Sequence, residues 1–307
     1  MEKLLLVLIP VGLIILVSLP CAFLSILAYR RKKKGRRSPF SGSLLRSPGQ
    51  SLLPQIDALT DDINSDLYGV IMVPLMVFSL AMAQFYFGYL TPTPWNIALH
   101  GFICLAAILF VAHKLSRRLI IRNELRLGLE AEMAVGQELN HLMREGYYVY
   151  HDFPAENFNI DHVAVGAGGI FAIETKGRSK PDKGRGTYDA TVTFDGNVLR
   201  FPDWKDHKFI EQARRQAEWL KRWVSSAIGE DVQVWPALAL PGWYIERKGK
   251  SDVLLYNGKN PNSLVRVQGK GVLTDNQIKR INHQFEQRCR DVEPVAYRKE
   301  KKEASRG

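Results

Sequence analysis

The chain has 307 residues, enough for one or two domains, and a formal net charge of +11. Its three cysteines include no CxxC pair and no Cys/His cluster, which excludes a structural zinc site and a disulfide framework. The common nucleotide-binding, metalloprotease and serine-hydrolase motifs (GxxxxGK, GxGxxG, HExxH and GxSxG) are also absent.

An uncharged run covers residues 4–29. At about 1.5 Å per residue, this run is long enough to cross a bilayer core of about 30 Å. A cleaved signal peptide is the alternative, but its apolar region would be about 7–15 residues long. A lipoprotein signal at Cys21 would have a small residue before it, where Pro20 stands. The sequence therefore favours an uncleaved transmembrane helix over residues 1–29.

The basic stretch RRKKKGRR at residues 30–37 follows directly. Because positively charged flanks stay in the cytoplasm, this end is predicted to be cytoplasmic and the N-terminus to lie outside. An arm that binds nucleic acid is the alternative interpretation of the same charges. Residues 30–66 as a whole are predicted to form a basic, then polar, cytoplasmic linker.

A transmembrane hairpin is predicted for residues 67–112. Two apolar runs, at about 67–90 and 95–112, flank the break TPTP, and further cations follow from Lys114. Three membrane helices would then place the N-terminus outside and the C-terminal domain in the cytoplasm, in an integral protein of the cell inner membrane. Gln84 and His100 lie within these runs and are predicted to pack the helices together.

Residues 113–290 have the pattern of a soluble α/β domain, and residues 291–307 that of a loose charged tail. The glycine-rich turn GAGG joins two apolar runs in a β-hairpin, and Gly146 and Thr274 are predicted helix caps. The expected helices cover 123–146, 208–228 and 274–290, and the expected strands or hairpins cover 147–153, 159–177, 190–201, 232–243 and 251–257.

Three charged residues stand out in the hairpin IDHVAVGAGGIFAIETKG, residues 160–177. Glu174 and Lys176 are two apart on a strand and share one face, and Asp161 lies on the neighbouring strand. Two carboxylates on adjacent strands can hold Mg²⁺, and a lysine beside them can position an attacking water or offset phosphate charge. An exposed Glu–Lys pair without catalytic function is the alternative interpretation.

This hairpin resembles the Asp…(Asp/Glu)-x-Lys signature of the PD-(D/E)xK nuclease superfamily. More closely, residues from about 126 to 240 are similar to a nuclease-related domain (NERD). Glu132 in GLEAEMAV matches the helix glutamate of that family, and Gln212 in FIEQARRQAEWL matches its later glutamine. Ala131 stands where the family usually has glycine, and Lys208-Phe209 replaces its frequent Asn-Pro.

The resemblance implies an α/β fold with a restriction-endonuclease-like core, a mixed central sheet flanked by helices, after the all-α transmembrane region. It also implies a Mg²⁺ (or Mn²⁺) site. Asp161, Glu174 and the Thr175 carbonyl would be metal ligands, and Lys176 would activate water. Glu132 would act as a ligand or support one, and Gln212 would orient substrate or the lysine.

Other candidates have simpler interpretations. His162 is predicted to be structural, because it points away from the face of Asp161. Phosphate contact is an open alternative for the basic loop at residues 177–186 and for the cations of the helix at residues 208–228. Core or rim packing is favoured for the tryptophans over base stacking. These are Trp204, Trp219, Trp223, Trp235 and Trp243.

The sequence thus predicts a membrane-anchored, Mg²⁺-dependent nuclease that hydrolyses DNA at the cytoplasmic membrane face, with RNA as the alternative, less favoured nucleic acid. The expected partners of the protein are nucleic acid and the lipid bilayer. The sequence indicates no protein partner and no oligomeric state. The basic charge after residue 112, 33 Lys and Arg against 26 Asp and Glu, suits either partner. A non-catalytic nucleic-acid-binding module and a membrane scaffold that keeps a nuclease fold are the rival functions.

Overall fold

A computed structural model describes residues 2–36, 38–267 and 272–296. The chain divides into two compact units. The first, Met1–Leu44 with Asp291–Gly307, contains helix α1 (Glu2–Lys33) and a β-bridge between Leu44 and Val292. The charged tail expected from residue 291 lies mostly outside the described residues. The second unit, Leu45–Arg290, contains every candidate site residue.

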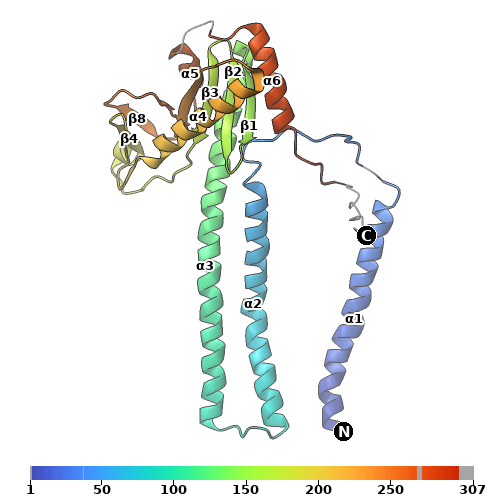
Figure 1. Cartoon of the computed structure of the whole chain (residues 1–307). Helices are drawn as coiled ribbons and strands as arrows, with labels where there is room; N and C mark the ends of the chain where they lie inside the picture. The colour runs from blue at the N-terminus through green and yellow to red at the C-terminus, as the bar shows by residue number, and fades with distance from the viewer. Residues whose placement is uncertain (1, 37, 268–271, 297–307) are drawn as a thin grey trace. The chain divides into compact units, whose positions relative to one another are not determined.

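Two long helices, α2 (Leu53–Tyr86) and α3 (Pro94–Leu139), run side by side as an antiparallel hairpin (Figure 1). Near one end Arg118 forms ion pairs with Asp66, at 2.5 Å, and with Asp62, at 2.7 Å. Near the other end His100 Nε2 lies 3.0 Å from Gln84 Oε1. The prediction that Gln84 and His100 pack the helices together is therefore confirmed.

Both helices of the hairpin are long and apolar enough to cross a membrane. Almost none of their most apolar stretches is buried, unlike the core helices of soluble proteins. The third expected span is helical within α1, but the side chains of residues 1–15 lie outside the described residues. The structure thus supports two of the three predicted membrane helices.

The hairpin and the C-terminal domain are not separated where the sequence suggested. Helix α2 begins at Leu53, so residues 53–66 are helical rather than part of a linker. Helix α3 continues without a break from the apolar run into the domain, and the expected boundary at residue 113 falls inside it. A short 3-10 helix, η1 (Asn140–Glu145), then ends at Gly146, whose φ of 83° confirms the predicted cap.

A five-stranded mixed sheet forms the centre of the domain, in the order β1-β2-β3-β7-β9. The first three strands are antiparallel, and β3, β7 and β9 are parallel. The sheet confirms the predicted mixed α/β core. Its strands are β1 (Tyr148–Pro154), β2 (Asn159–Gly166), β3 (Gly169–Thr175), β7 (Val234–Ala239) and β9 (Leu254–Tyr256).

Helices cover both faces of this sheet. Alternate side chains of β2 and β3, such as Val163 and Ala172, pack with α4 (Lys208–Ile228) and α6 (Asp275–Cys289). The intervening ones, such as Phe171, pack against the end of α3 and η1, with α5 (Asn262–Val267) nearby. Thr274 caps α6 through a capping box, as predicted. Every residue of β3 is buried, so a carboxylate on this strand needs internal partners.

A second, four-stranded sheet has the order β6-β5-β4-β8 and lies beside the N-terminal end of α4 (Figure 1). Its hairpin β4–β5 follows the sequence prediction, whereas the two strands β6 and β8 were not expected. The strands are β4 (Thr191–Phe194), β5 (Leu199–Arg200), β6 (Lys205–Asp206) and β8 (Tyr244–Arg247), preceded by η2 (Gly186–Ala190).

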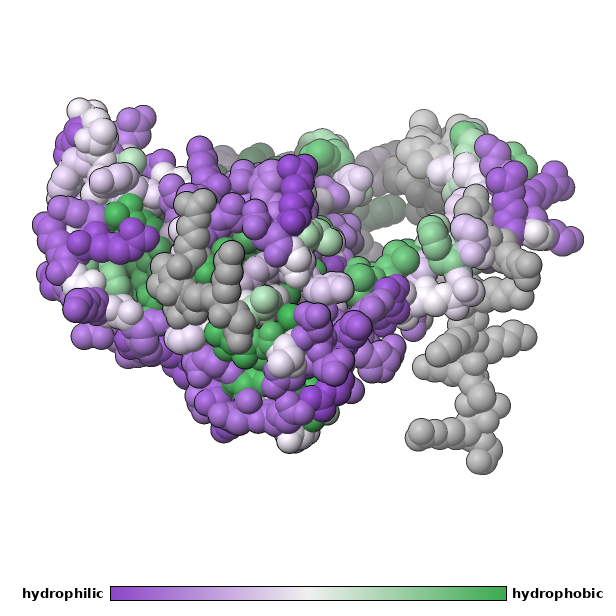
Figure 2. Space-filling view, turned by 90° about the horizontal axis from the view of Figure 1, so that it is seen from above, coloured by the Kyte–Doolittle hydropathy of each residue, from purple (hydrophilic) through white to green (hydrophobic). Residues whose placement is uncertain are grey.

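Seen from the side away from the α2–α3 hairpin, the domain presents mostly hydrophilic residues, with hydrophobic ones in the hollows (Figure 2).

Candidate active site

Asp161 lies where strands β2 and β3 separate. Their last backbone pair in this direction joins His162 to Ile173, so Asp161 and Glu174 stand opposite one another just beyond the ladder. The Asp161 carboxylate accepts a hydrogen bond of 2.6 Å from the Thr175 backbone N–H. The prediction that the hairpin brings Asp161 towards Glu174 and Lys176 is therefore correct.

Glu174 accepts three side-chain hydrogen bonds, from Lys176, Gln212 and Gln216. It is 2% exposed and points to the sheet face that α4 covers. Its Oε1 accepts hydrogen bonds from Lys176 Nζ and from Gln212 Nε2, the latter at 2.7 Å, and its Oε2 accepts one of 2.5 Å from Gln216 Nε2. Gln212 was predicted, but Gln216, one helical turn further on, was not.

Glu132 reaches the same cluster from α3, on the other side of the sheet. It is buried, and burial raises its pKa to about 7, with repulsion from Asp152 and Glu174 adding to the effect. Lys176 and a hydrogen bond from the Gly49 backbone act in the opposite direction. Burial likewise raises the pKa of Asp161 well above its usual value, followed by repulsion from Glu174 and Glu132.

These residues fit a hard divalent cation. Three carboxyl groups share the neighbourhood of one ammonium group, Lys176, so ionising all three would leave negative charge that Lys176 alone does not balance. Mg²⁺ accepts one or two carboxylates and keeps several waters, which suits Asp161 and Glu174 as direct ligands. Among the described residues, no three His, Cys, Asp or Glu side chains converge as a ready-made metal site. Coordination by the Thr175 carbonyl stays a prediction.

Phe209 holds the cations of the site in place. Its ring lies 5.3 Å from Lys176 Nζ and 5.0 Å from the Arg178 guanidinium carbon. Such cation–π contacts are worth roughly 0.5–1 kcal/mol at exposed sites and more where water is excluded. Phe209 stands at one of the two positions where the sequence departs from the resembled family pattern, so this departure gives Lys176 a neighbouring aromatic face.

A segment before α2 lies over Glu132, and we call residues 46–52 the strap. Arg46 Nη1 pairs with Asp152 Oδ2 at 2.8 Å, and Ser51 Oγ donates to Asp152 Oδ1 at 2.6 Å. Asp152 is 2% exposed and adopts a φ of 47°, an uncommon conformation that these contacts hold. The strap thereby brings the Gly49 backbone to the Glu132 carboxylate, a contact with no signal in the sequence.

Gly177 allows the end of β3 to approach α3 closely. A Cβ at this position would lie 2.6 Å from the Leu127 carbonyl oxygen and 2.8 Å from the Ala131 Cβ. We therefore expect Gly177→Ala to destabilise the domain by about 1–3 kcal/mol and to shift Lys176 relative to Glu132. Chemical denaturation followed by tryptophan fluorescence measures the loss.

The double variant Gly177→Ala/Ala131→Gly serves as the control for this prediction. It removes the contact with the Ala131 Cβ but keeps the one with the Leu127 carbonyl. Glycine inside helix α3 itself costs about 1 kcal/mol, so Gly177→Ala should cost less stability in the Ala131→Gly background than in the wild type. A single variant as stable as the wild type would contradict the close packing of Gly177 against α3.

Other predicted candidates lie outside the cluster. His162 is fully buried beside His151, with 2.9 Å between their Nδ1 atoms, and burial lowers its pKa well below the usual value, as expected of a structural residue. Lys183 and Arg185 of the basic loop pair with Asp203 and Asp189. Arg214 pairs with Asp252 at 2.6 Å, and Lys221 lies 3.6 Å from Asp231.

A model of one protein family matches this part of the chain. The family is described as the nuclease-related domain, and the match covers residues 127–241. It includes Glu132, Asp161, Glu174, Lys176 and Gln212. No curated protein and no solved structure gives a significant match to the chain.

Proposed function

Because residues 127–241 carry a nuclease-related domain, we propose that this protein hydrolyses DNA phosphodiester bonds with the help of Mg²⁺. The observation that carries this proposal is the position of Glu174. Its buried carboxylate is held by Lys176, Gln212 and Gln216, beside Asp161 at the point where two strands separate. A structural ion pair does not need two glutamines or a second acidic residue in addition.

The residues of the cluster would divide the work as follows. Asp161 and Glu174 would hold Mg²⁺, which supplies a Lewis acid and a bound water of lowered pKa. Lys176 Nζ, fixed between Glu174 and the Phe209 ring, is placed to donate a hydrogen bond to the attacking water or to a phosphate oxygen. Gln212 holds the shared Glu174 oxygen in position and so orients Lys176 indirectly.

The proposed location is the cytoplasmic side of the cell inner membrane, with the N-terminus outside. Helix α3 is continuous from the apolar run, which ends near Ala112, to Glu132. Twenty residues of helix at about 1.5 Å each place the site about 30 Å beyond the apolar run. The paired helices α2 and α3 would thus hold the nuclease away from the lipid surface as a stalk, rather than directly on it.

A non-catalytic nucleic-acid-binding module is the second candidate function. It is favoured by one observation: three internal donors already occupy the Glu174 carboxylate, and Lys176 is among them. In this alternative, the cluster only fixes the fold, and surface cations bind the phosphates.

Purified full-length protein in detergent micelles, incubated with single- and double-stranded DNA, tests the two functions. We expect cleavage with Mg²⁺ or Mn²⁺, no cleavage with EDTA, and a loss of about 10²–10⁴-fold in Lys176→Ala. Lys248→Ala is the matched control, because Lys248 pairs with Glu246 on β8, outside the cluster. Salt-dependent binding without cleavage under any metal condition would identify the binding module instead.

A further inference from the structure

We propose that a pocket along α4, beside Trp219, is a subsite for an unpaired nucleobase of a DNA strand, selective for bases with an exocyclic amino group. This inference rests on the proposed function and adds to it the form of the substrate, a single-stranded segment next to the cleaved bond. It is carried by the position, the lining and the chemistry of the pocket.

The pocket continues the helix face that carries the active-site glutamines. Gln212, Gln216, Trp219 and Trp223 follow one another at intervals of four, three and four residues, so they lie on one face of α4. Seven residues separate Gln212 from Trp219, or about 10 Å along the helix axis. At about 3.4 Å per stacked nucleotide, a strand with a phosphate at the active site would place a base about three nucleotides away in this pocket.

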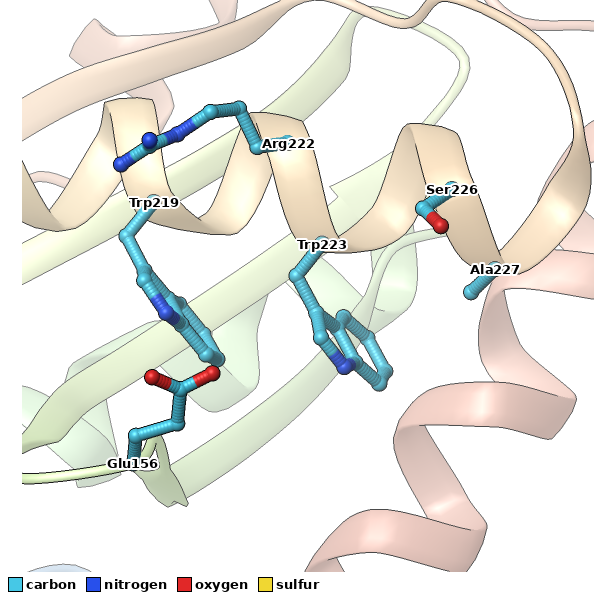
Figure 3. A pocket seen from close by; sticks show the side chains of 6 residues that line it. All are labelled: Glu156, Trp219, Arg222, Trp223, Ser226 and Ala227. Atoms are coloured by element: carbon cyan, nitrogen blue, oxygen red, sulfur yellow. The ribbon is translucent and has the colours of Figure 1, made fainter.

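The pocket is large enough for a nucleobase, and one of its walls is aromatic. Its volume is about 450 Å³, within the range of about 300–1,000 Å³ typical of ligand sites. The indole rings of Trp219 and Trp223 hang from the same side of α4, nearly parallel, with a 9° angle and 6.2 Å between centroids (Figure 3). The lining residues are Glu156, Trp219, Arg222, Trp223, Ser226 and Ala227.

The two indoles differ in how far they belong to the core. Trp223 contacts the buried rings of Phe153 and Phe285, at 5.6 and 5.8 Å between centroids. Trp219 instead contacts Phe158, which is itself 38% exposed, at 5.5 Å between centroids. The guanidinium carbon of Arg288, from α6, lies 5.5 Å from the centroid of Trp219 and 4.8 Å from that of Trp223, so it covers part of both rings. Trp223 thus anchors the platform, and Trp219 forms its outer, half-buried part. Stacking on such a platform accepts any base, because every base has a π-face.

Glu156 supplies the selectivity. Its side chain, on the loop between β1 and β2, lines the same pocket as Trp219 (Figure 3). Within the described part of the chain, no hydrogen bond or ion pair occupies this exposed carboxylate. An ionised carboxylate only accepts hydrogen bonds, so it favours the amino groups of adenine, cytosine and guanine. Thymine offers only an imino N–H between two carbonyl oxygens, and the negative carboxylate repels these two oxygens.

Arg222 provides a cation for the sugar–phosphate backbone. It is exposed, and its guanidinium extends along α4 towards Trp219 (Figure 3). The neighbouring cations Arg214 and Lys221 are engaged with Asp252 and Asp231, and Arg288, over the indole rings, donates to the Pro154 carbonyl. Arg222 therefore remains as a phosphate contact beside the indole platform, which accounts for backbone affinity without sequence preference.

Binding of fluorescently labelled single-stranded dodecamers to the full-length Lys176→Ala protein in detergent and EDTA tests the proposal. We expect oligo(dA) and oligo(dC) to bind about five- to tenfold more tightly than oligo(dT). Trp219→Leu should weaken binding of all three about five- to hundredfold. Glu156→Gln should remove the preference, and Arg222→Gln should lower the slope of affinity against salt by about one phosphate contact.

Trp235→Leu is the matched control, because Trp235 lines a different pocket on the far side of α4, beside Arg214. Equal losses in the Trp219 and Trp235 variants, or a preference for oligo(dT), would overturn the subsite. Tighter binding of oligo(rA) than of oligo(dA) would contradict a DNA strand as the ligand. Urea unfolding of each variant shows whether a loss comes from misfolding, and Trp219→Tyr, which keeps an aromatic face, should then restore binding.

Failure of the nuclease proposal gives a different result. If the wild type never cleaves DNA but the base preference depends on Glu156, the subsite stands on a binding module. If the wild type cleaves DNA but neither Trp219 nor Glu156 affects binding, the nuclease stands and the subsite is refuted.

Discussion

Asp161→Asn should strongly reduce DNA hydrolysis while making the metal-free protein more stable at about pH 8. The amide oxygen of asparagine can still accept the Thr175 N–H, so the separation of β2 and β3 is preserved. The negative charge that would hold Mg²⁺ is lost. Loss of even an outer partner of a metal ligand costs about 10–100-fold, so we expect a loss of about 10²-fold or more.

The gain in stability follows from the pKa of Asp161. Burial and the neighbouring Glu174 and Glu132 raise this pKa well above its value in the unfolded chain. The folded protein therefore binds the proton more tightly than the unfolded one, and its stability falls as the pH rises through the raised pKa. Asparagine carries no charge to repel, so the variant should match the wild type near pH 4 and exceed it at about pH 8.

Thermal unfolding with and without Mg²⁺ measures this difference. Millimolar Mg²⁺ should stabilise the wild type, because an ion that binds only the folded state favours it, and should leave the variant unchanged. Asp252→Asn is the control, since Asp252 is an exposed carboxylate paired with Arg214; it should retain hydrolysis and gain no stability. An Asp161→Asn variant that cleaves DNA normally would remove Asp161 from the proposed metal site.

The core of the candidate site could be predicted from the sequence because its residues are close together along the chain. Asp161, Glu174 and Lys176 lie within one hairpin, and strand alternation with a short glycine-rich turn is sufficient to place them on one face. Gln212 could be identified only by its resemblance to a family pattern. Gln216 could have been found from its spacing, since it repeats the Gln212 side chain one helical turn later.

The strap and the continuity of α3 could not be predicted in the same way. The contact between Arg46 and Asp152 joins residues 106 positions apart, and nothing in the polar composition of residues 38–52 distinguishes an anchored segment from a linker. Helix α3 passes from an apolar to an amphipathic pattern without glycine or proline between Lys114 and Arg126, so only the pattern changes and not the helix. Hydropathy marks the edge of an apolar run, whereas the helix ends where its capping groups lie.

Glu132 should make Mg²⁺-dependent hydrolysis fall as the pH drops below about 7. Its pKa is raised to about 7, chiefly by burial, so below that pH it takes up a proton and the cluster loses one negative charge. Metal sites bind less tightly when their ligands are protonated, and at subsaturating Mg²⁺ the rate should fall by up to about tenfold per pH unit. Saturating Mg²⁺ should shift this fall to lower pH, because the bound ion favours the ionised carboxylate.

Glu132→Gln separates this residue from the other groups that titrate. The variant should bind Mg²⁺ more weakly and lose the part of the pH dependence near pH 7 that Glu132 contributes, whereas Asp161, whose pKa is also raised by burial, still titrates. In the metal-free state, the wild type should lose stability as the pH rises because of Glu132, and the variant should not show this loss. The shift of the wild-type pKa from 4.5 to about 7 corresponds to on the order of 3 kcal/mol, accumulated between these two pH values.

Glu130→Gln is the control on the same helix, because Glu130 is exposed and two residues from Glu132. It should keep both the rate and the pH profile of the wild type. If Glu132→Gln retains the wild-type profile, the titrating group is not Glu132, and the contact between the Gly49 backbone and Glu132 serves the fold alone. If the profile is lost, the strap positions a carboxylate of the site, which ties hydrolysis to the segment that leads into the α2–α3 hairpin.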